Sequence, residues 1–224
     1  MQALRDEVVD RIGAAFVERG WQLWDEAGRE TPTLTLSRPN DVIHSIALTS
    51  LPLSFGGVRF SPSLEVAHVD VSRLAAAFAG RSWSGAGDTS LFGTTLATLV
   101  RAGGDLKQSA VGWTIESRSD VEPAVDAMFG NIKIHGMAYL NRFRDLEDLI
   151  SWMRADKGYQ ILVGNLAVAL AVSGASEEAA QTLHDYVAFV ARMPPGVLRD
   201  RTRSFVEAFA AHFGYGADAA GPAA

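Results

Sequence analysis

The sequence predicts an α+β fold, in which an N-terminal helix covers an antiparallel meander sheet of about five strands and an all-helical C-terminal half follows. Apolar residues first recur every four positions, then alternate in short runs, and then return to the helical period. We expect an α+β sheet region at residues 1–118, a helical region at 119–214 that packs on the sheet as one unit, and a disordered tail at 215–224.

The first element is an amphipathic helix. Leu4, Val8, Ile12 and Phe16 are spaced by one helical turn and form an apolar stripe. Gly20 follows the last apolar turn and is a typical residue for ending a helix. We expect the apolar stripe of this helix to cover one face of the sheet.

Short alternating runs then predict the strands. Turn residues such as Gly, Pro, Asn and Asp separate these runs, which favours an antiparallel meander. The strands are expected at residues 21–24, 33–36, 42–49, 64–71 and 110–116. Two helices are expected before the last strand, at residues 72–79 and 91–101, the first with Asp70 or Ser72 as its N-cap.

The glycine-rich segment RSWSGAGDTSLFG, residues 81–93, invites comparison with a phosphate-binding loop. Such a loop follows a strand, opens a helix and usually carries a lysine. Here a predicted helix precedes the glycines, and the first lysine of the chain is Lys107. We therefore interpret the segment as a connector.

The second half follows the helical period throughout. Ser119 and Glu122 have the spacing of a capping box, in which each side chain satisfies a free backbone amide at a helix start. Gly174 is the expected turn of a helical hairpin. Helices are expected near residues 120–135, 145–156, 158–173, 176–192 and 197–213.

Composition restricts the class of protein. The chain has 224 residues, a formal net charge of −6 and no cysteine, so disulfides and thiolate metal sites are excluded. The acidic charge argues against nucleic acid and favours a partner protein with a basic surface. The N-terminus lacks the pattern of a signal peptide, and the apolar run at 161–175 is shorter than the roughly 20 residues of a membrane span. We expect a cytoplasmic protein without membrane contact.

No motif for catalysis, nucleotide binding or metal binding occurs, and we expect no metal and no cofactor. His44, His68 and Asp70 are the residues that could form a site if their strands adjoin, as metal ligands or as a base with its orienting acid. The other interpretation is that each histidine makes a hydrogen bond within the core. The sequence does not decide between them.

Trp21 and Trp24 lie on opposite faces of the first predicted strand. We expect one of them to belong to the core and the other to line a groove or rim, because an indole offers a large contact area with one polar group.

Two stretches resemble an uncharacterised bacterial family of α+β proteins. Residues 15–50 contain GWQLWDE, TLTLSR and VIHSIALTS in that order, and residues 129–153 read FGNIKIHGMAYLNRFRDLEDLISWM. The resemblance implies an immunity-like or accessory protein that binds a partner, and it carries over no catalytic residue.

These observations together predict a non-catalytic protein-binding module, such as an immunity-type inhibitor or an accessory factor. The alternative is a small-molecule-binding protein or enzyme with a pocket between the sheet and the helices, using the two histidines. The sequence does not indicate the oligomeric state.

Overall fold

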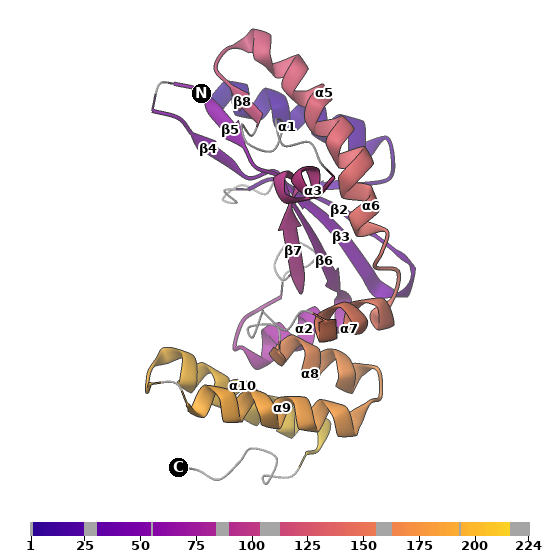
Figure 1. The fold of residues 1–224 in the computed structure, drawn as a ribbon, viewed down its shortest axis with the longest axis vertical. Helices are drawn as coiled ribbons and strands as arrows, with labels where there is room; N and C mark the ends of the chain where they lie inside the picture. The colour runs from indigo at the N-terminus through magenta and orange to yellow at the C-terminus, as the bar shows by residue number, and fades with distance from the viewer. Residues whose placement is uncertain are drawn as a thin grey trace. The chain divides into compact units, whose positions relative to one another are not determined.

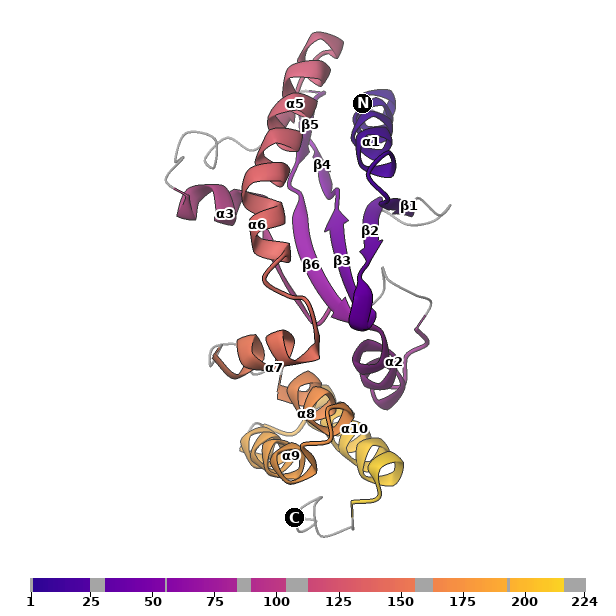
Figure 2. The ribbon, with the colours of Figure 1, turned by 90° about the vertical axis from the view of Figure 1, so that its right-hand side faces the viewer.

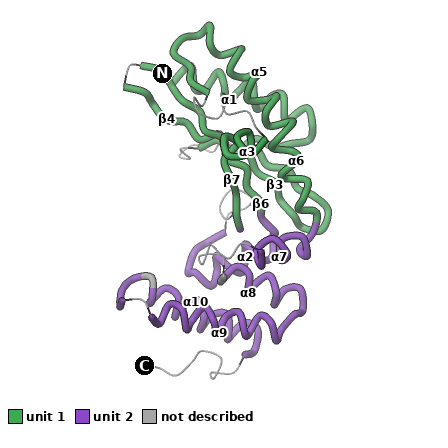
Figure 3. The backbone as a smooth tube through the Cα atoms, viewed as in Figure 1, with its two compact units in different colours: residues 1–66, 92–144 green, residues 67–91, 145–224 purple. Residues whose placement is uncertain are grey.

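The fold is α+β, as the sequence predicts (Figure 1). The computed structural model describes residues 2–24, 31–54, 56–83, 90–103, 113–155, 163–192 and 194–215. The chain divides into two compact units, which are described separately below (Figure 3). Unit 1 comprises residues 1–66 and 92–144, and unit 2 comprises residues 67–91 and 145–224.

These units differ from the division at residue 118 that the sequence predicts. The first helices of the predicted helical region belong to unit 1, because they cover the sheet of that unit. The short helix after the fourth predicted strand belongs to unit 2, where it packs against later helices. A change of period along the chain therefore does not mark the boundary between the units.

Unit 1 contains two antiparallel sheets and a layer of helices. One sheet has the strand order β1-β2-β3-β6-β7 and the other the order β4-β5-β8. The strands are β1 Gln22–Trp24, β2 Thr33–Ser37, β3 Val42–Ala47, β4 Ser50–Pro52, β5 Val58–Phe60, β6 Ser63–His68, β7 Phe92–Thr95 and β8 Trp113–Ile115. The helices are α1 Gln2–Val17, α3 Leu96–Ala102, α5 Val121–Asn131 and α6 Met137–Leu140, with 3-10 turns η1 Pro39–Asp41 and η2 Arg118–Asp120 and a π-helical turn η3 Ile132–Gly136.

The five-stranded sheet is confirmed, but its fifth strand is not the predicted one. The fifth strand is β7, which begins the segment predicted as a helix at 91–101; only its second part, α3, is helical. The strand predicted at 110–116 is β8, which pairs with β5 in the second sheet. The sequence pattern at 91–101 predicts a helix, but its first residues form a strand. They do so because Phe92 pairs with Val66 of β6, and a partner so distant in the chain leaves no local signal. The first residues of the strand predicted at 110–116, residues 110–112, lie outside the described ranges.

One face of the larger sheet forms the core of unit 1. Leu23 is opposite Leu34, and Leu34 is opposite Ile46, so these side chains share one face. Helix α1 covers this face at close range, because a Cβ on Gly13 would lie 2.9 Å from Cδ2 of Leu23. Three of the four residues of the predicted stripe, Val8, Ile12 and Phe16, are buried, and Leu4 is partly exposed.

Helices α5 and α6 form one continuous rod joined by the π-helical turn, which runs alongside the strands of the sheet (Figure 2). The helix predicted at 120–135 therefore continues to Leu140. The rod approaches β6 most closely at Gly136, where a Cβ would lie 2.7 Å from Cδ2 of the buried Leu64. The wider π turn places the small residue against the strand.

The capping box before α5 uses Ser117 and Asp120, and the prediction of Ser119 and Glu122 is wrong. The Asp120 carboxylate accepts hydrogen bonds from the Ser117 backbone amide at 2.8 Å and the Ser117 hydroxyl at 2.9 Å. These bonds, with a further one from the Glu116 amide, hold the pKa of Asp120 below its ordinary value. Both pairs have the same spacing, and the pair nearer the strand forms the box.

Unit 2 is helical in its described residues apart from the end of β6, which confirms the helical C-terminal half. Helix α2 starts at Val69, directly after the strand, so the predicted strand end at 71 and the predicted N-caps Asp70 and Ser72 are wrong. The helices are α2 Val69–Phe78, α7 Leu146–Ala155, α8 Val163–Val172, α9 Ser176–Ala191 and α10 Val197–Phe213. No helix of the described ranges has both the length and the apolar character that crossing a bilayer requires.

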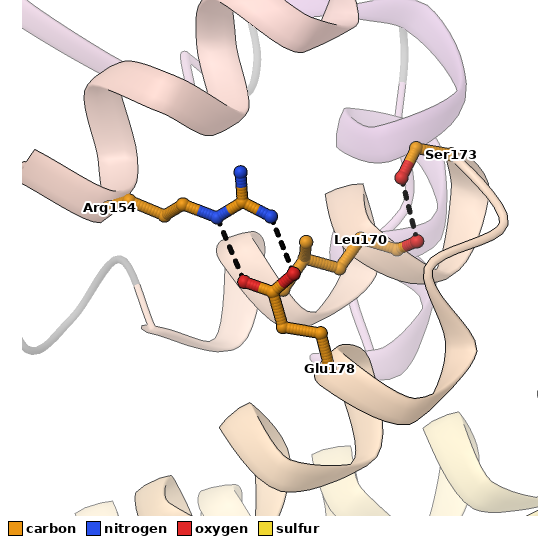
Figure 4. Close-up of polar contacts among 4 residues, drawn as sticks. All are labelled: Arg154, Leu170, Ser173 and Glu178. Atoms are coloured by element: carbon orange, nitrogen blue, oxygen red, sulfur yellow. Dashed lines mark hydrogen bonds and ion pairs between the residues drawn. The ribbon is translucent and has the colours of Figure 1, made fainter.

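Helices α8 and α9 form the predicted hairpin, with Gly174 at its turn. The glycine has a φ of +88°, which side chains disfavour. The Ala175 amide donates to the Leu170 carbonyl at 2.9 Å and the Gly174 amide to the Ala171 carbonyl at 3.2 Å, the pattern of a Schellman motif. The Ser173 hydroxyl also donates to the Leu170 carbonyl, at 2.9 Å (Figure 4).

An ion pair joins this hairpin to α7 within unit 2. Arg154 donates from Nε and Nη2 to the two carboxylate oxygens of Glu178, at 2.8 and 2.5 Å (Figure 4). Both side chains are nearly half exposed, at 44% and 48%. The pair therefore contributes little to stability, about 0–1 kcal/mol, as is usual for exposed ion pairs.

An aromatic cluster forms the core between α2 and α10. The ring of Phe78 makes edge contacts with Phe205 and Phe209, at centroid distances of 5.6 and 5.8 Å. Tyr215 stacks on Phe209 at 5.5 Å and donates from its hydroxyl to the Ser176 carbonyl at 2.9 Å. The predicted disordered tail thus starts too early at residue 215, and residues 216–224 lie outside the described ranges.

We predict that Gly136→Ala destabilises unit 1 by about 1–3 kcal/mol, because the added methyl overlaps the buried Leu64 side chain. Gly136 has a φ of −66°, so the backbone itself accepts alanine. The measurement is the free energy of unfolding in urea.

The matched control is Gly130→Ala in α5, where a Cβ would meet nothing within 4 Å. We expect this variant to be more stable than the wild type by about 0.5–1 kcal/mol, because alanine favours the helix. Equal effects of the two substitutions would contradict the close packing of the rod on β6.

Candidate functional site

His44 is a residue of β3, and its side chain lies in the core of unit 1, next to the turn that follows α6. The strand places its ring on the same face as Ile46, and the side chain is 1% exposed. Nε2 forms a 3.0 Å hydrogen bond with the Phe143 carbonyl, and Arg38 donates from Nε to Nδ1 at 3.4 Å. Arg38 also donates from Nη2 to the Asn141 side-chain oxygen at 2.7 Å.

These partners determine the tautomer of His44. A carbonyl only accepts and a guanidinium only donates, so Nε2 carries the proton and Nδ1 presents its lone pair. Burial lowers the pKa of His44, the hydrogen bond to the Phe143 carbonyl opposes this shift, and the charge of Arg38 adds to it. His44 is therefore a neutral ring whose two nitrogens are both used within the fold.

The structure does not bring the predicted histidine site together in one unit. His68 ends β6 and is buried, but it belongs to unit 2. Asp70 lies in the first turn of α2, where it forms an ion pair with Arg73 at 2.8 Å. The sequence predicts that His68 and Asp70 share one face of a single strand, and this prediction is wrong. The strand β6 ends at His68, and Asp70 belongs to helix α2. No group of three or more His, Asp or Glu residues in the described ranges could hold a metal.

The two tryptophans differ in what the structure describes. Trp21 is 4% exposed and meets Phe16 edge-on at 5.4 Å, so it belongs to the core. The Trp24 backbone pairs with Thr33, and its side chain lies outside the described ranges. The prediction of one core tryptophan is confirmed, whereas the prediction of a groove tryptophan stays a prediction.

The exposed side of α1 is a surface that the sequence analysis did not identify. We call it the α1 stripe; it contains Ala3, Asp10, Ala14 and Val17, which share one side of the helix because they are three, four or seven residues apart. Val17 is 51% exposed and is one of the exposed large apolar residues of the described ranges. Small apolar side chains and one carboxylate thus lie together on a rigid element.

The helix layer that contains the α1 stripe carries exposed carboxylates without ion-pair partners among the described residues. Helix α1 packs on α5, with the rings of Phe16 and Phe129 5.3 Å apart. The bases of this layer are engaged: Arg11 and Arg118 both pair with Glu7, at 3.1 and 3.2 Å. In the described ranges, the exposed carboxylates without an ion pair on these helices are Asp10, Glu18, Glu122 and Asp126.

A hollow of about 340 Å³ opens between the start of α1 and the hairpin β4–β5. Its lining combines residues with hydrogen-bond donors, Gln2, Arg5 and Ser50, with the apolar residues Pro52 and Val58. Arg5 also forms an ion pair with Asp6 at 3.0 Å. This volume is at the lower end of the range of small-ligand sites.

Neither surface could be located from the sequence. The helical period does indicate which residues of α1 face the solvent, but the engagement of Arg118 with Glu7 joins residues that are distant in the chain. Similarly, the hollow joins α1 to β4 and β5, and these three-residue strands are too short to show a period.

Comparison of the chain with family models, with curated proteins and with solved structures gives no match. The resemblance to a bacterial immunity-like family stays a prediction. Any functional conclusion therefore depends on the chain's own residues.

Tyr139 of α6 is the buried ionisable side chain nearest the turn that holds His44. It is 6% exposed and meets the ring of Phe143 edge-on at 5.3 Å. Its hydroxyl has no hydrogen-bond partner among the described residues. Burial raises the pKa of Tyr139 to about 12, although the charge of Arg142 opposes the shift. The hydroxyl therefore costs desolvation energy.

We predict that Tyr139→Phe leaves the fold unchanged and stabilises it by up to about 1 kcal/mol, because it removes a desolvated hydroxyl and keeps the ring contact. Urea unfolding measures the change. The control is Tyr186→Phe on the partly exposed side of α9, with an expected change below about 0.5 kcal/mol. A loss of stability above about 1 kcal/mol in Tyr139→Phe would show that the hydroxyl is hydrogen bonded.

Proposed function

We propose that this chain is a non-catalytic, cytoplasmic protein-binding module, an immunity-type inhibitor or accessory factor, and that it binds a basic surface of its partner through the α1 stripe. The observation that carries the proposal is the combination of exposed Val17 and Ala14 with unpaired carboxylates on the same helix layer. Apolar contact surrounded by charge is the usual composition of a protein interface.

Electrostatics supports a basic partner. The chain has a net charge of −6, and the two arginines nearest Glu7 are already engaged with it. Asp10 and Glu18 thus keep their charge available for a cationic surface. Such complementarity accelerates association and makes it sensitive to salt.

A catalytic role has weaker support. His44, the most buried of the predicted site residues, already uses both ring nitrogens in hydrogen bonds to Arg38 and Phe143. A histidine that serves as a base needs a nitrogen that can reach substrate. The interpretation as a core histidine therefore fits His44 better than the interpretation as a catalytic group.

The hollow beside α1 favours a second candidate function, the binding of a small molecule. Gln2, Arg5 and Ser50 contribute an amide, a guanidinium and a hydroxyl, and Pro52 and Val58 contribute apolar surface. This chemistry suits a small carboxylate with an apolar body. A screen of monocarboxylates by thermal unfolding tests it: a rise in Tm that Ser50→Ala reduces would favour this function.

We predict that the tagged chain, purified from its native cell at low salt, co-elutes with one stoichiometric protein that high salt releases. We further expect Ala14→Arg to reduce the affinity of that complex by at least about tenfold, because it places bulk and like charge against the basic partner. Quantitative mass spectrometry and titration with the purified partner measure both effects.

The matched control is Ala188→Arg on α9, which also introduces an arginine at an exposed helical alanine and changes the net charge equally. We expect this variant to retain the complex. A complex that both variants retain would remove the α1 stripe as the interface, and elution of the wild-type chain alone would remove the proposed function.

A further inference from the structure

The turn after α6 is held by residues that are far away in the sequence. Asn141 and Phe143 are bound by Arg38 and His44, which precede them by 103 and 99 residues. The turn contains the last residues of unit 1, because unit 2 resumes at Asp145. These four residues therefore form a polar attachment of this segment to the sheet of unit 1.

The attachment consists of a chain of three hydrogen bonds with His44 at its centre. Arg38 joins Asn141 at 2.7 Å and His44 Nδ1 at 3.4 Å, and His44 Nε2 joins the Phe143 carbonyl at 3.0 Å. The backbone amide of Arg38 donates to the Val42 carbonyl at 2.8 Å, which holds the arginine against the start of β3. The guanidinium can bind Asn141 and His44 together only while Nδ1 has a lone pair.

We propose that these residues form an acid-sensitive clamp, in which protonation of His44 at Nδ1 displaces Arg38 and loosens the hold on Asn141. A proton taken up from solvent turns Nδ1 from an acceptor into a donor. Two donors with two positive charges then face each other across the former 3.4 Å hydrogen bond. The Nε2 bond to Phe143 persists and becomes charge-assisted, so the hold through Arg38 is the one that is lost.

The charged and titratable groups on the described segments that hold His44 are few. They are Arg38 and the exposed Asp41 before β3, Tyr139 in α6 and Arg142 in the turn. Of the flanking strands, β2 has no ionisable side chain and β6 has Glu65 and His68. The charge that acts on the His44 pKa is that of Arg38, and it opposes a proton on the ring.

The stability of the fold depends on pH in a direction that follows from the neutral state of the His44 ring. The pKa of His44 is lowered below its ordinary value of 6.5, so the unfolded chain binds more protons than the folded chain as the pH falls below that value. The contribution of the neutral ring to stability is complete above about pH 6.5 and is lost as the pH falls through the folded pKa. One bound proton changes the unfolding equilibrium up to about tenfold per pH unit.

Hydrogen exchange of the full chain between pH 7 and pH 5, corrected for intrinsic exchange rates, tests the clamp. We expect the amides of residues 141–144 to lose protection severalfold on acidification in the wild type. In Arg38→Met the protection should be low at both pH values. In His44→Gln it should be independent of pH, whereas the control His68→Gln should keep the wild-type pH dependence.

A nitrogen-detected NMR titration of the wild-type histidines provides a measurement that needs no variant to fold. The expected result is an Nε2–H tautomer for His44 at pH 7 that takes up its second proton together with the loss of protection at residues 141–144. A His44 ring protonated on Nδ1 at pH 7 would overturn the clamp. Unchanged protection of the wild-type turn down to pH 5 would overturn it as well.

Discussion

The close packing of the α5–α6 rod on the larger sheet is the constraint on which unit 1 depends. Gly136 allows the rod to approach Leu64, because a Cβ at this position would lie 2.7 Å from Cδ2 of the Leu64 side chain. This approach places Tyr139 in the core and brings the turn after Leu140 to the ring of His44. The π-helical turn at Ile132–Gly136 rotates the residues that follow it relative to α5. The same local feature therefore affects both the packing of the rod on β6 and the hydrogen bond between His44 and the turn after α6.

Much of this architecture could be predicted from local patterns, because long amphipathic segments carry many independent signals. Helices α1, α9 and α10 end within a few residues of their predicted limits, since each has several apolar turns and a glycine or proline boundary. Strands β4 and β5 have three residues each and show no period. Strand β7 contains Gly93 and obtains its identity from its pairing with β6, which no local pattern records.

The candidate site shows the same limit more clearly. The sequence places His44 on an apolar face and leaves open whether it is a ligand or a core residue. Its partners decide the matter, and they are Arg38 in the preceding turn and a carbonyl 99 residues later. Backbone carbonyls leave no signal in a sequence at all. His68 and Asp70 illustrate the converse, because a strand-to-helix transition separates two residues that the alternation places together.

Helix α1 has two sides with separate tasks. Val8, Ile12 and Phe16 are buried, and Gly13 fixes the helix against Leu23 within van der Waals distance. The opposite side, with Ala14 and Val17, is exposed and therefore has a direction fixed by the buried side. A surface held in this way loses little conformational entropy when a partner covers it, which is the advantage that preorganised elements give to binding. Substitutions on the two sides should consequently affect different quantities, the free energy of unfolding on one side and the affinity for a partner on the other.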